Sequence, residues 1–365
     1  MRFILPACLI FFIACSGDAR KSKGFDDFDA YLTAELPANE PGGAILIMKD
    51  DSVVFAKGYG VADLQTKEPI TTKTLFNLGS ISKTFVANAI LRLAEQNKLS
   101  VEDSLEKYFP NFADPQLAKK VRIKHLLTHT SGLPDNRNVE ADTVFYLTAK
   151  DEENWYPVTQ AKYLIFEPGQ RYEYSNPAFN ALALIVEKVS GQKWQTYVRD
   201  SIMRVSGMTM SRITDGPYPT DSVAHAYQKN HGQWVEDDYG EEPTFAAAGN
   251  GGVWSSVEEL AKYELALRDS VFLSDSVVRE SRTVKTFPMW FDTRKPFIGW
   301  SWFIQKNADG LVTVGHTGDQ GGFLCNYVTI PEKKIFFVIL CNTRRDVDGF
   351  TEKVFSVLKQ NNYFD

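Results

Sequence analysis

Residues 78–96 read "LGSISKTFVANAILRLAEQ", a stretch that opens on glycine and serine and continues as an almost wholly apolar helix. Side chains such as Phe85 and Leu91 lie on nearly all sides of this helix, so we expect it to be buried. Ser80 falls in the first turn, where free backbone N–H groups and the positive end of the helix favour negative charge. Lys83 follows one turn later on the same face. A buried, unpaired ammonium is costly, so we expect Lys83 either to pair or to lose its proton and act as a base.

The Ser-x-x-Lys spacing occurs four times in the chain, so the spacing alone does not identify a site. The other copies are residues 104–107 in the charged run "VEDSLEKYF", residues 190–193 in the turn "SGQK", and residues 356–359 near the chain end. None of them opens an apolar helix. This setting makes Ser80 the candidate nucleophile among the four; taken alone, the motif is equally the pattern of a serine that caps a helix beside a lysine that pairs with a buried acid.

Composition limits the class of protein. The chain has 365 residues, 44% of them hydrophobic, which is enough to bury a substantial core. The formal net charge is −6 and the sequence contains no basic run, so nucleic-acid binding has no electrostatic support. We expect no nucleic-acid partner.

The N-terminus has the pattern of a targeting segment. "MRFILPACLIFFIAC" carries one arginine and then an apolar run too short to span a bilayer, which indicates a signal peptide over residues 1–14. Ala14 followed by Cys15 resembles a bacterial lipobox, which implies a lipid on the Cys15 thiol and a short tether over residues 15–24. We expect an exported protein, anchored by lipid in the bacterial cell envelope on the periplasmic or outer-membrane side. The alternative is a simple signal peptide that is cut nearby.

Strand patterns lie at both ends of the chain and helical patterns lie between them. Alternating and apolar runs predict a hairpin of two strands at 43–60 and single strands at 310–318, 323–330 and 334–342. Helical spacing is found at 25–36, 80–97, 118–128, 177–191, 194–205, 256–268 and 347–359. This order predicts an α+β fold with one antiparallel sheet built from both chain ends, flanked by helices. We place an α/β lobe at about 25–90 and 285–365 within a domain spanning 25–365, a helical lobe at about 91–284, and the site between them.

Two further triplets occur once each in the chain. "GQRYEYSNPAFN" contains Tyr174-Ser-Asn176, and "VTVGHTGDQGG" contains His316-Thr-Gly318. A catalytic serine needs a proton acceptor and donors for the oxyanion, and these triplets supply residue types that serve both needs.

The three motifs in this order resemble the serine β-lactamase and penicillin-binding protein superfamily, above all its class C-like branch with D,D-peptidases and esterases. Flanking segments resemble the same branch: "GYGVAD" (58–63), "LLTHTSGLP" (126–134), "FEPGQRYEYSN" (166–176), "GNGGVWSSVEELAKY" (249–263) and "GWSWF" (299–303). The resemblance covers about residues 25–360. It implies a β-lactamase/D,D-peptidase-like fold.

The resemblance also implies roles for the site residues. Ser80 would attack a carbonyl and form an acyl-enzyme, while Lys83 and Tyr174 would share the removal of its proton. Asn176 would hold Lys83 or the substrate amide. The backbone N–H groups of Ser80 and Asp319 would form the oxyanion hole. Which of Lys83 and Tyr174 is the base stays open, because each changes the pKa of the other.

The third triplet departs from the common pattern of the family. Many members have Lys-Thr-Gly where this chain has His316-Thr317-Gly318, and a histidine is only partly charged at pH 7. We therefore expect an esterase, amidase or peptidase with a small-molecule or peptide acyl substrate and no cofactor. The alternatives are a β-lactamase, a D,D-carboxypeptidase, or a sensor of peptidoglycan or β-lactams that deacylates slowly. Neither the substrate nor the oligomeric state follows from the sequence.

Two other sets of residues have an alternative chemical interpretation. His125 and His129 have the spacing of half a zinc site, but the glutamate of a zinc-protease helix is missing, so we expect no metal. Cys325 and Cys341 flank a predicted turn and could form a disulfide in an exported protein. We expect two buried free thiols instead.

Overall fold

The computed structural model describes four segments of the chain, residues 23–141, 149–213, 219–237 and 248–365. The expected signal peptide, Cys15 and most of the expected tether lie outside these described residues.

A six-stranded antiparallel sheet forms the centre of the molecule, with strand order β2-β1-β11-β10-β9-β8. Its strands come from both ends of the chain: β1 (Gly43–Lys49), β2 (Ser52–Tyr59), β8 (Phe303–Lys306), β9 (Val312–Gln320), β10 (Phe323–Ile330) and β11 (Ile335–Cys341). The N-terminal β1 pairs directly with the C-terminal β11. The prediction of an α+β fold with one sheet from both chain ends is therefore confirmed.

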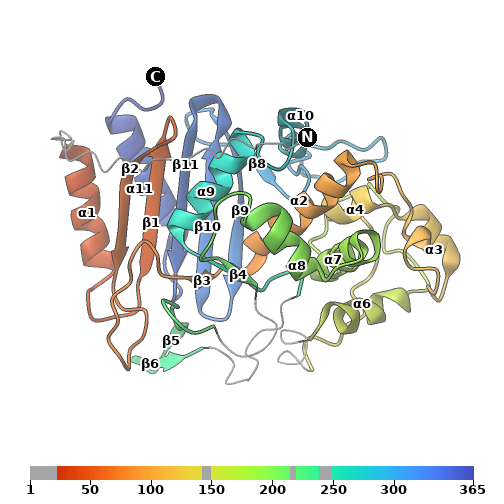
Figure 1. Cartoon of the computed structure of the whole chain (residues 1–365), viewed down its shortest axis with the longest axis horizontal. Coiled ribbons are helices and arrows are strands. Elements are labelled where there is room, and N and C mark those ends of the chain that lie inside the picture. The colour runs from red at the N-terminus through yellow and green to blue at the C-terminus, as the bar shows by residue number, and fades with distance from the viewer. Residues whose placement is uncertain (1–22, 142–148, 214–218, 238–247) are drawn as a thin grey trace, which may run out of the picture.

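Two interior strands, β1 and β11, are apolar on both faces, which indicates that both faces of the sheet are covered. Successive residues of β1 and β11 alternate between two buried clusters, with Leu46 and Val338 on the inner face and Ile45 and Ile339 on the outer face. The outer cluster includes residues of α1 (Lys23–Glu35) and α11 (Val347–Gln360), the two terminal helices. In Figure 1 these helices lie to the left of the sheet, and the other helices lie toward its right.

The inner face of the sheet is covered by α9 (Val257–Arg268), which packs against β1 and β11. Ser256 caps α9 by accepting a hydrogen bond from the Glu259 backbone N–H. The segment 257–268 falls within the range that we assign to the helical lobe from sequence, but in the structure it lies on the sheet. Its apolar stripe, including Leu260 and Leu267, is therefore part of the sheet's own core.

The helices on the right of Figure 1 pack around α7 (Asn176–Ser190), which contacts α2, α4, α6 and α8. The contacting helices are α2 (Ser82–Glu95), α4 (Ile123–Leu127), α6 (Asp151–Thr159) and α8 (Trp194–Val198). The remaining elements of this region are η2 (Leu105–Lys107), α3 (Pro115–Lys120) and η3 (Arg199–Met203), and α10 (Asp275–Ser281) packs against α9. The prediction of one helix over 118–128 is wrong. Arg122 forms a bridge with Ser104, and this tertiary contact holds the chain extended between α3 and α4.

Two small sheets and two short turns complete the described elements. They are the sheet β3 (Phe76–Asn77), β7 (Val253–Ser255) and β4 (Arg212–Ile213), the hairpin β5 (Tyr227–Asn230) and β6 (Gln233–Glu236), and the 3₁₀ turns η1 (Gly79–Ile81) and η4 (Pro331–Lys333). The pairing of β3 with β7 brings the start of the 78–96 stretch beside residues 253–255.

Cys325 and Cys341 are both free and buried, as expected. In the pairing of β10 with β11, Cys325 is opposite Leu340 and Cys341 is opposite Leu324. This offset of one residue directs the two thiols to opposite faces of the sheet, because side chains alternate along a strand. Cys325 joins the inner cluster and Cys341 the outer one.

A buried carboxylate joins α9 to the sheet. Glu264 is 0% exposed and accepts hydrogen bonds from Arg268, Arg282, Tyr327 and Thr329. Burial alone raises the pKa of Glu264, but the two guanidinium groups outweigh it and bring the pKa down to about 2. The folded state therefore favours the ionised carboxylate.

We expect Glu264→Gln to lower the free energy of unfolding by about 3–5 kcal/mol at neutral pH, because it leaves a buried guanidinium without a counter-charge. The pKa of Glu264 is lower in the folded chain than the unfolded value of about 4.3, so its contribution is complete above pH ~4.3. As pH falls from there through about 2, the contribution is lost and the difference between the two proteins should shrink. Urea unfolding at several pH values measures it.

The matched control is Asp51→Asn, which removes the exposed carboxylate that pairs with the same Arg268. Exposed pairs contribute about 0–1 kcal/mol, so this variant should unfold nearly as the parent does. Equal losses for the two variants at neutral pH would contradict the assignment of the buried network as the stabilising one.

Candidate active site

Two glycines allow the chain to bring Ser80 against the sheet. Gly79 has φ +50°, and a Cβ there would lie 2.9 Å from the Asp319 backbone nitrogen. A Cβ on Gly318 would lie 1.9 Å from the Leu78 carbonyl oxygen. Only glycine permits both approaches, so η1 lies directly on β9. Ser80, the next residue, thereby follows directly on the contact with the Asp319 amide, which the resemblance implies as an oxyanion donor.

Two of the predicted side chains meet at the Ser80 hydroxyl. The Lys83 Nζ lies 2.9 Å from Ser80 Oγ, and the Tyr174 hydroxyl donates a hydrogen bond of 2.6 Å to the same oxygen. Ser80 and Lys83 come from η1 and α2, whereas Tyr174 lies in the loop just before α7. Residues distant in the sequence thus form one continuous hydrogen-bonded group.

Lys83 is fully buried, and no carboxylate among the described residues forms an ion pair with it. Burial lowers the pKa of Lys83 well below its usual value, and the positive charge of Arg137 lowers it further. The second partner of Nζ is the backbone carbonyl of Asn250, at 2.6 Å. A neutral amine can donate to that carbonyl while it turns its lone pair toward Ser80 Oγ.

The resemblance has Asn176 hold Lys83 or the substrate amide, and Asn176 is not among the hydrogen-bond partners of Lys83 Nζ in the described chain. It begins α7, and within the described chain the carbonyl of Asn250 receives the lysine N–H instead. No direct signal in the sequence points to Asn250, because a backbone carbonyl is present at every residue. The only indication was that the surrounding "GNGG" resembles the family.

The Tyr174 ring is held by a histidine that sequence reasoning considered only as a metal ligand. His129 stacks on Tyr174 with ring centroids 4.4 Å apart, and its Nδ1 accepts a hydrogen bond of 3.0 Å from the Ser175 N–H. The ring of Tyr174 is 38% exposed, yet the protein around it desolvates the phenol and raises its pKa. Tyr174 is therefore a protonated hydroxyl at neutral pH.

His129 and His125 do not form a zinc site. The Nδ1 atom of His125 accepts from the Arg122 N–H, while that of His129 accepts from Ser175, so each ring is engaged by the backbone. Across the described segments, no group of three or more His, Cys, Asp or Glu residues is arranged to hold a metal ion.

His316 lies on β9 facing the inner side and is only 3% exposed. Its Nδ1 donates to the carbonyl oxygen of Thr317 at 2.6 Å. Burial lowers the pKa of His316 to about 3, and the nearby Lys83 contributes to this shift. His316 is therefore neutral at physiological pH and offers no positive charge to a substrate. The cation next to this part of β9 is Arg344, whose guanidinium forms two hydrogen bonds of 2.9 and 3.0 Å with the Asp319 carboxylate.

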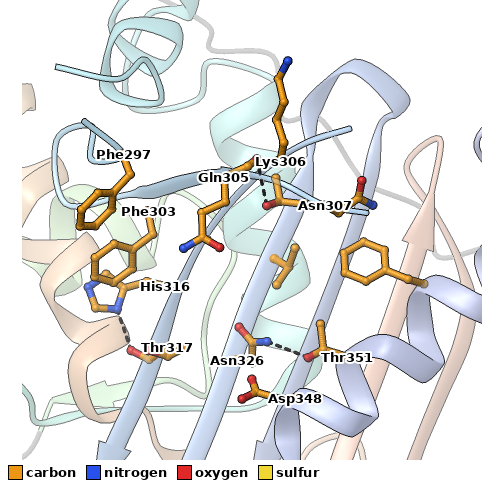
Figure 2. A pocket seen from close by; sticks show the side chains of 14 residues that line it. Phe297, Phe303, Gln305, Lys306, Asn307, His316, Thr317, Asn326, Asp348 and Thr351 are labelled. Atoms are coloured by element: carbon orange, nitrogen blue, oxygen red, sulfur yellow. Dashed lines mark hydrogen bonds between the residues drawn. The ribbon is translucent and has the colours of Figure 1, made fainter. Parts of the chain in front are cut away.

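A groove of about 490 Å³ adjoins the site on the outer face of the sheet. It lies among β8, β9, β10 and α11, and it meets the site at His316 and Thr317 (Figure 2). Thr317 is opposite Asn326 in the β9–β10 pairing, and Asn326 donates a hydrogen bond of 2.8 Å to Thr351 on α11. Phe297 and Phe303 form the end of the groove beside His316, as Figure 2 shows. The groove therefore combines polar and aromatic surface with one basic residue, Lys306, and one acidic residue, Asp348.

A serine hydroxyl between a buried lysine and a tyrosine, beside a strand amide, is the site of a serine hydrolase. A sequence model of the Beta-lactamase family matches residues 29–360. The chain therefore belongs to the beta-lactamase family. Within the described part of the chain, no helix has the length and apolar character needed to cross a membrane.

Known proteins with similar sequence or structure agree with this assignment. The chain is 26% identical over 329 residues to "Penicillin-binding protein 4*" of Bacillus subtilis, covering 84% of this chain and 69% of that one. It is 27% identical to a "Putative D-alanyl-D-alanine carboxypeptidase" of Escherichia coli O157:H7, covering 81% and 77%. The octameric penicillin-binding protein homologue of Pyrococcus abyssi has a similar structure, with a TM-score of 0.74, 30% identity, and coverage of 87% and 72%.

We expect the rate at which a fluorophosphonate labels Ser80 to rise with pH through the lowered pKa of Lys83, because only the neutral amine accepts a proton. The pKa of His316 is about 3, so His316→Asn should leave the position of this rise unchanged. Labelling rates from intact mass between about pH 5 and pH 10, where free His and Lys titrate, measure it. A rise centred near pH 6.5 that disappears in His316→Asn would show that His316 is the titrating group.

Proposed function

We propose that the chain is a hydrolase in which Ser80 is the nucleophile, Lys83 the general base and Tyr174 the general acid. One observation carries the proposal: Ser80 Oγ is held at 2.9 Å from a buried lysine and at 2.6 Å from a tyrosine hydroxyl. The pKa of Lys83 is lowered and that of Tyr174 is raised, which favours lysine as the base and tyrosine as the acid.

In this mechanism the proton of Ser80 passes to the neutral Lys83 Nζ as Oγ forms a bond to the carbonyl carbon of the substrate. The resulting oxyanion accepts hydrogen bonds from the backbone N–H groups of Ser80 and Asp319, each worth about 10²–10³ in rate. Tyr174 donates its proton to the leaving group as the bond to the carbonyl carbon breaks, and Lys83 returns a proton to Tyr174. Water then hydrolyses the acyl-enzyme by the same transfers in reverse.

The substrate class that we propose is an amide, a D-amino-acid peptide or an ester, rather than a β-lactam that is turned over rapidly. His316 is neutral, and Arg344 is already engaged by Asp319, so neither residue supplies a free positive charge to a substrate carboxylate beside Ser80. The groove is lined by Thr317, which lies two residues along β9 from the Asp319 amide, and two residues along a strand span only about 6.8 Å. This short distance supports a substrate that extends beyond the scissile bond into the groove. The relatives named as a penicillin-binding protein and a D-alanyl-D-alanine carboxypeptidase make D,D-peptide hydrolysis the second candidate.

We also propose that the protein is exported and anchored by a lipid on Cys15. The support is the sequence of residues 1–15 alone, with its single arginine, its short apolar run and the Ala14–Cys15 pair. The tether over residues 15–24 would then hold the hydrolase domain close to the membrane surface.

We expect a β-lactam and a nitrophenyl ester to acylate Ser80, and a fluorophosphonate to phosphonylate it. The ester should also be turned over. Ser80→Ala should remove both the adduct and the ester hydrolysis, and Lys83→Met should slow acylation by about 10²–10⁴, the usual loss of a general base. Time-resolved intact mass spectrometry follows the adducts, and absorbance follows the ester.

The control is Ser104→Ala, which removes the serine of another Ser-x-x-Lys pair and should change neither signal. Ester hydrolysis that survives Ser80→Ala without any adduct would overturn the mechanism. A stable adduct with no turnover of any acyl donor would favour a sensor, and rapid cephalosporin hydrolysis would favour a β-lactamase.

For the anchor, we expect the mature protein to begin at Cys15 and to carry the added mass of acyl chains, because the lipid is attached to the residue that follows the cut. Cys15→Ala should lack this mass and should not be recovered as a lipoprotein from membranes. The control is Cys8→Ala, which alters a cysteine inside the removed segment and should leave the mature mass unchanged. A mature N-terminus at any other residue would refute the anchor.

A further inference from the structure

Asp151, the first residue of α6, is a buried carboxylate that the mechanism above does not use. It is 5% exposed and accepts three hydrogen bonds. The Asn180 side chain and the Gly249 N–H both donate to Oδ1 at 2.8 Å, and the Trp194 indole N–H donates to Oδ2 at 2.8 Å. Three donors around two oxygens suit an ionised carboxylate, which is an acceptor at both oxygens.

These hydrogen bonds lead from Asp151 to the lysine of the site. Asn180 also donates to the Asn250 side-chain oxygen at 2.9 Å, so Asp151 holds residues 249 and 250 at two points. The backbone carbonyl of Asn250 then accepts the Lys83 Nζ hydrogen bond at 2.6 Å. Asp151, Asn180, Asn250 and Lys83 therefore form one connected chain of contacts that ends at Ser80.

The position of Asp151 is energetically costly unless these contacts are complete. Burial raises the pKa of Asp151 to about 7, against the opposing effect of the hydrogen bonds from Gly249, Asn180 and Trp194. The three donors come from three separate parts of the chain, on α7, on α8 and in the loop before β7. A buried acid with this arrangement ties the loop that carries Asn250 to the helices behind it.

We propose that Asp151 is a positioning residue of the serine site, which fixes the Asn250 carbonyl and through it the direction of the Lys83 amine. The proposal rests on the function proposed above, because it assigns to Asp151 the orientation of the general base. A misplacement of about 1 Å in such a group can lower a rate by about 10²-fold. Asp151 touches neither the substrate nor the reacting atoms, so its loss should slow acylation without weakening binding.

The test compares fluorophosphonate labelling of Ser80 in the full chain and in Asp151→Asn, and separates the maximal rate constant from the half-saturating concentration. The asparagine keeps the size of the side chain, but its NH₂ group must face one of the three donors. We expect the maximal rate constant to fall by about 10–100-fold with the half-saturating concentration unchanged. Trp194→Phe removes the indole donor, so the double variant Asp151→Asn/Trp194→Phe should recover most of the rate.

Glu187→Gln is the matched control. Glu187 lies on the same α7 and accepts from the Trp194 backbone N–H, but none of its hydrogen bonds reaches residues 249 and 250. It should label at the parental rate. If Asp151→Asn does not fold, Asn180→Ala breaks the same chain of contacts and should show the same separation of rate from binding.

Folded variants at Asp151 and Asn180 that label at the parental rate would overturn the inference. Variants that lose only thermal stability and keep the labelling rate would overturn it as well. A change in the half-saturating concentration as large as the change in the maximal rate constant would also contradict the inference. Labelling of the parent chain distinguishes the inference about Asp151 from the proposed function. If the parent forms no adduct on Ser80, the proposed function fails, whereas normal labelling of both parent and variant removes only the role of Asp151.

Discussion

The close contact between the start of the 78–96 stretch and strand β9 is the constraint on which the site depends. Gly79 and Gly318 leave no side chain between the two backbones, so η1 meets β9 at the distance of direct atomic contact. This contact joins η1 and the start of α2 to the C-terminal part of the sheet. Because it is made by backbone atoms, it fixes Ser80 relative to the Asp319 amide more rigidly than a contact between flexible side chains would.

Glu264 and Lys83 are both buried, and they meet the free-energy cost of removing a charge from water in two different ways. Glu264 is surrounded by guanidinium and hydroxyl groups and stays ionised, which serves to join α9, β10 and the segment after α10. Lys83 has a carbonyl and a hydroxyl as its partners instead, and its pKa falls. The first arrangement stabilises a fold, whereas the second prepares an amine that can take a proton. Asp151 lies between these cases, since it is buried among neutral donors.

The sequence predicted the fold where local pattern and tertiary structure agree. The apolar run at 334–342 and the helical spacing at 177–191 placed β11 and α7 within a residue or two of their observed bounds. The prediction failed at 118–128, where the bridge between Ser104 and Arg122 interrupts a helical pattern. For the site, the motifs predicted Ser80, Lys83 and Tyr174, and the structure places these three residues together. His129 was considered only as a metal ligand, since stacking on Tyr174 has no signature in the sequence.

By itself, the sequence determined which side chains carry reactive groups and which elements they begin, because helix starts, strand alternation and turn residues are local properties. It also determined that a lysine would be buried beside a serine. Only the tertiary structure decided what surrounds them: the neutral state of His316, the Asn250 carbonyl on Lys83, and the link from there to Asp151. These depend on burial and on partners from distant parts of the chain, and a carbonyl partner in particular is identical at every residue until the fold selects one.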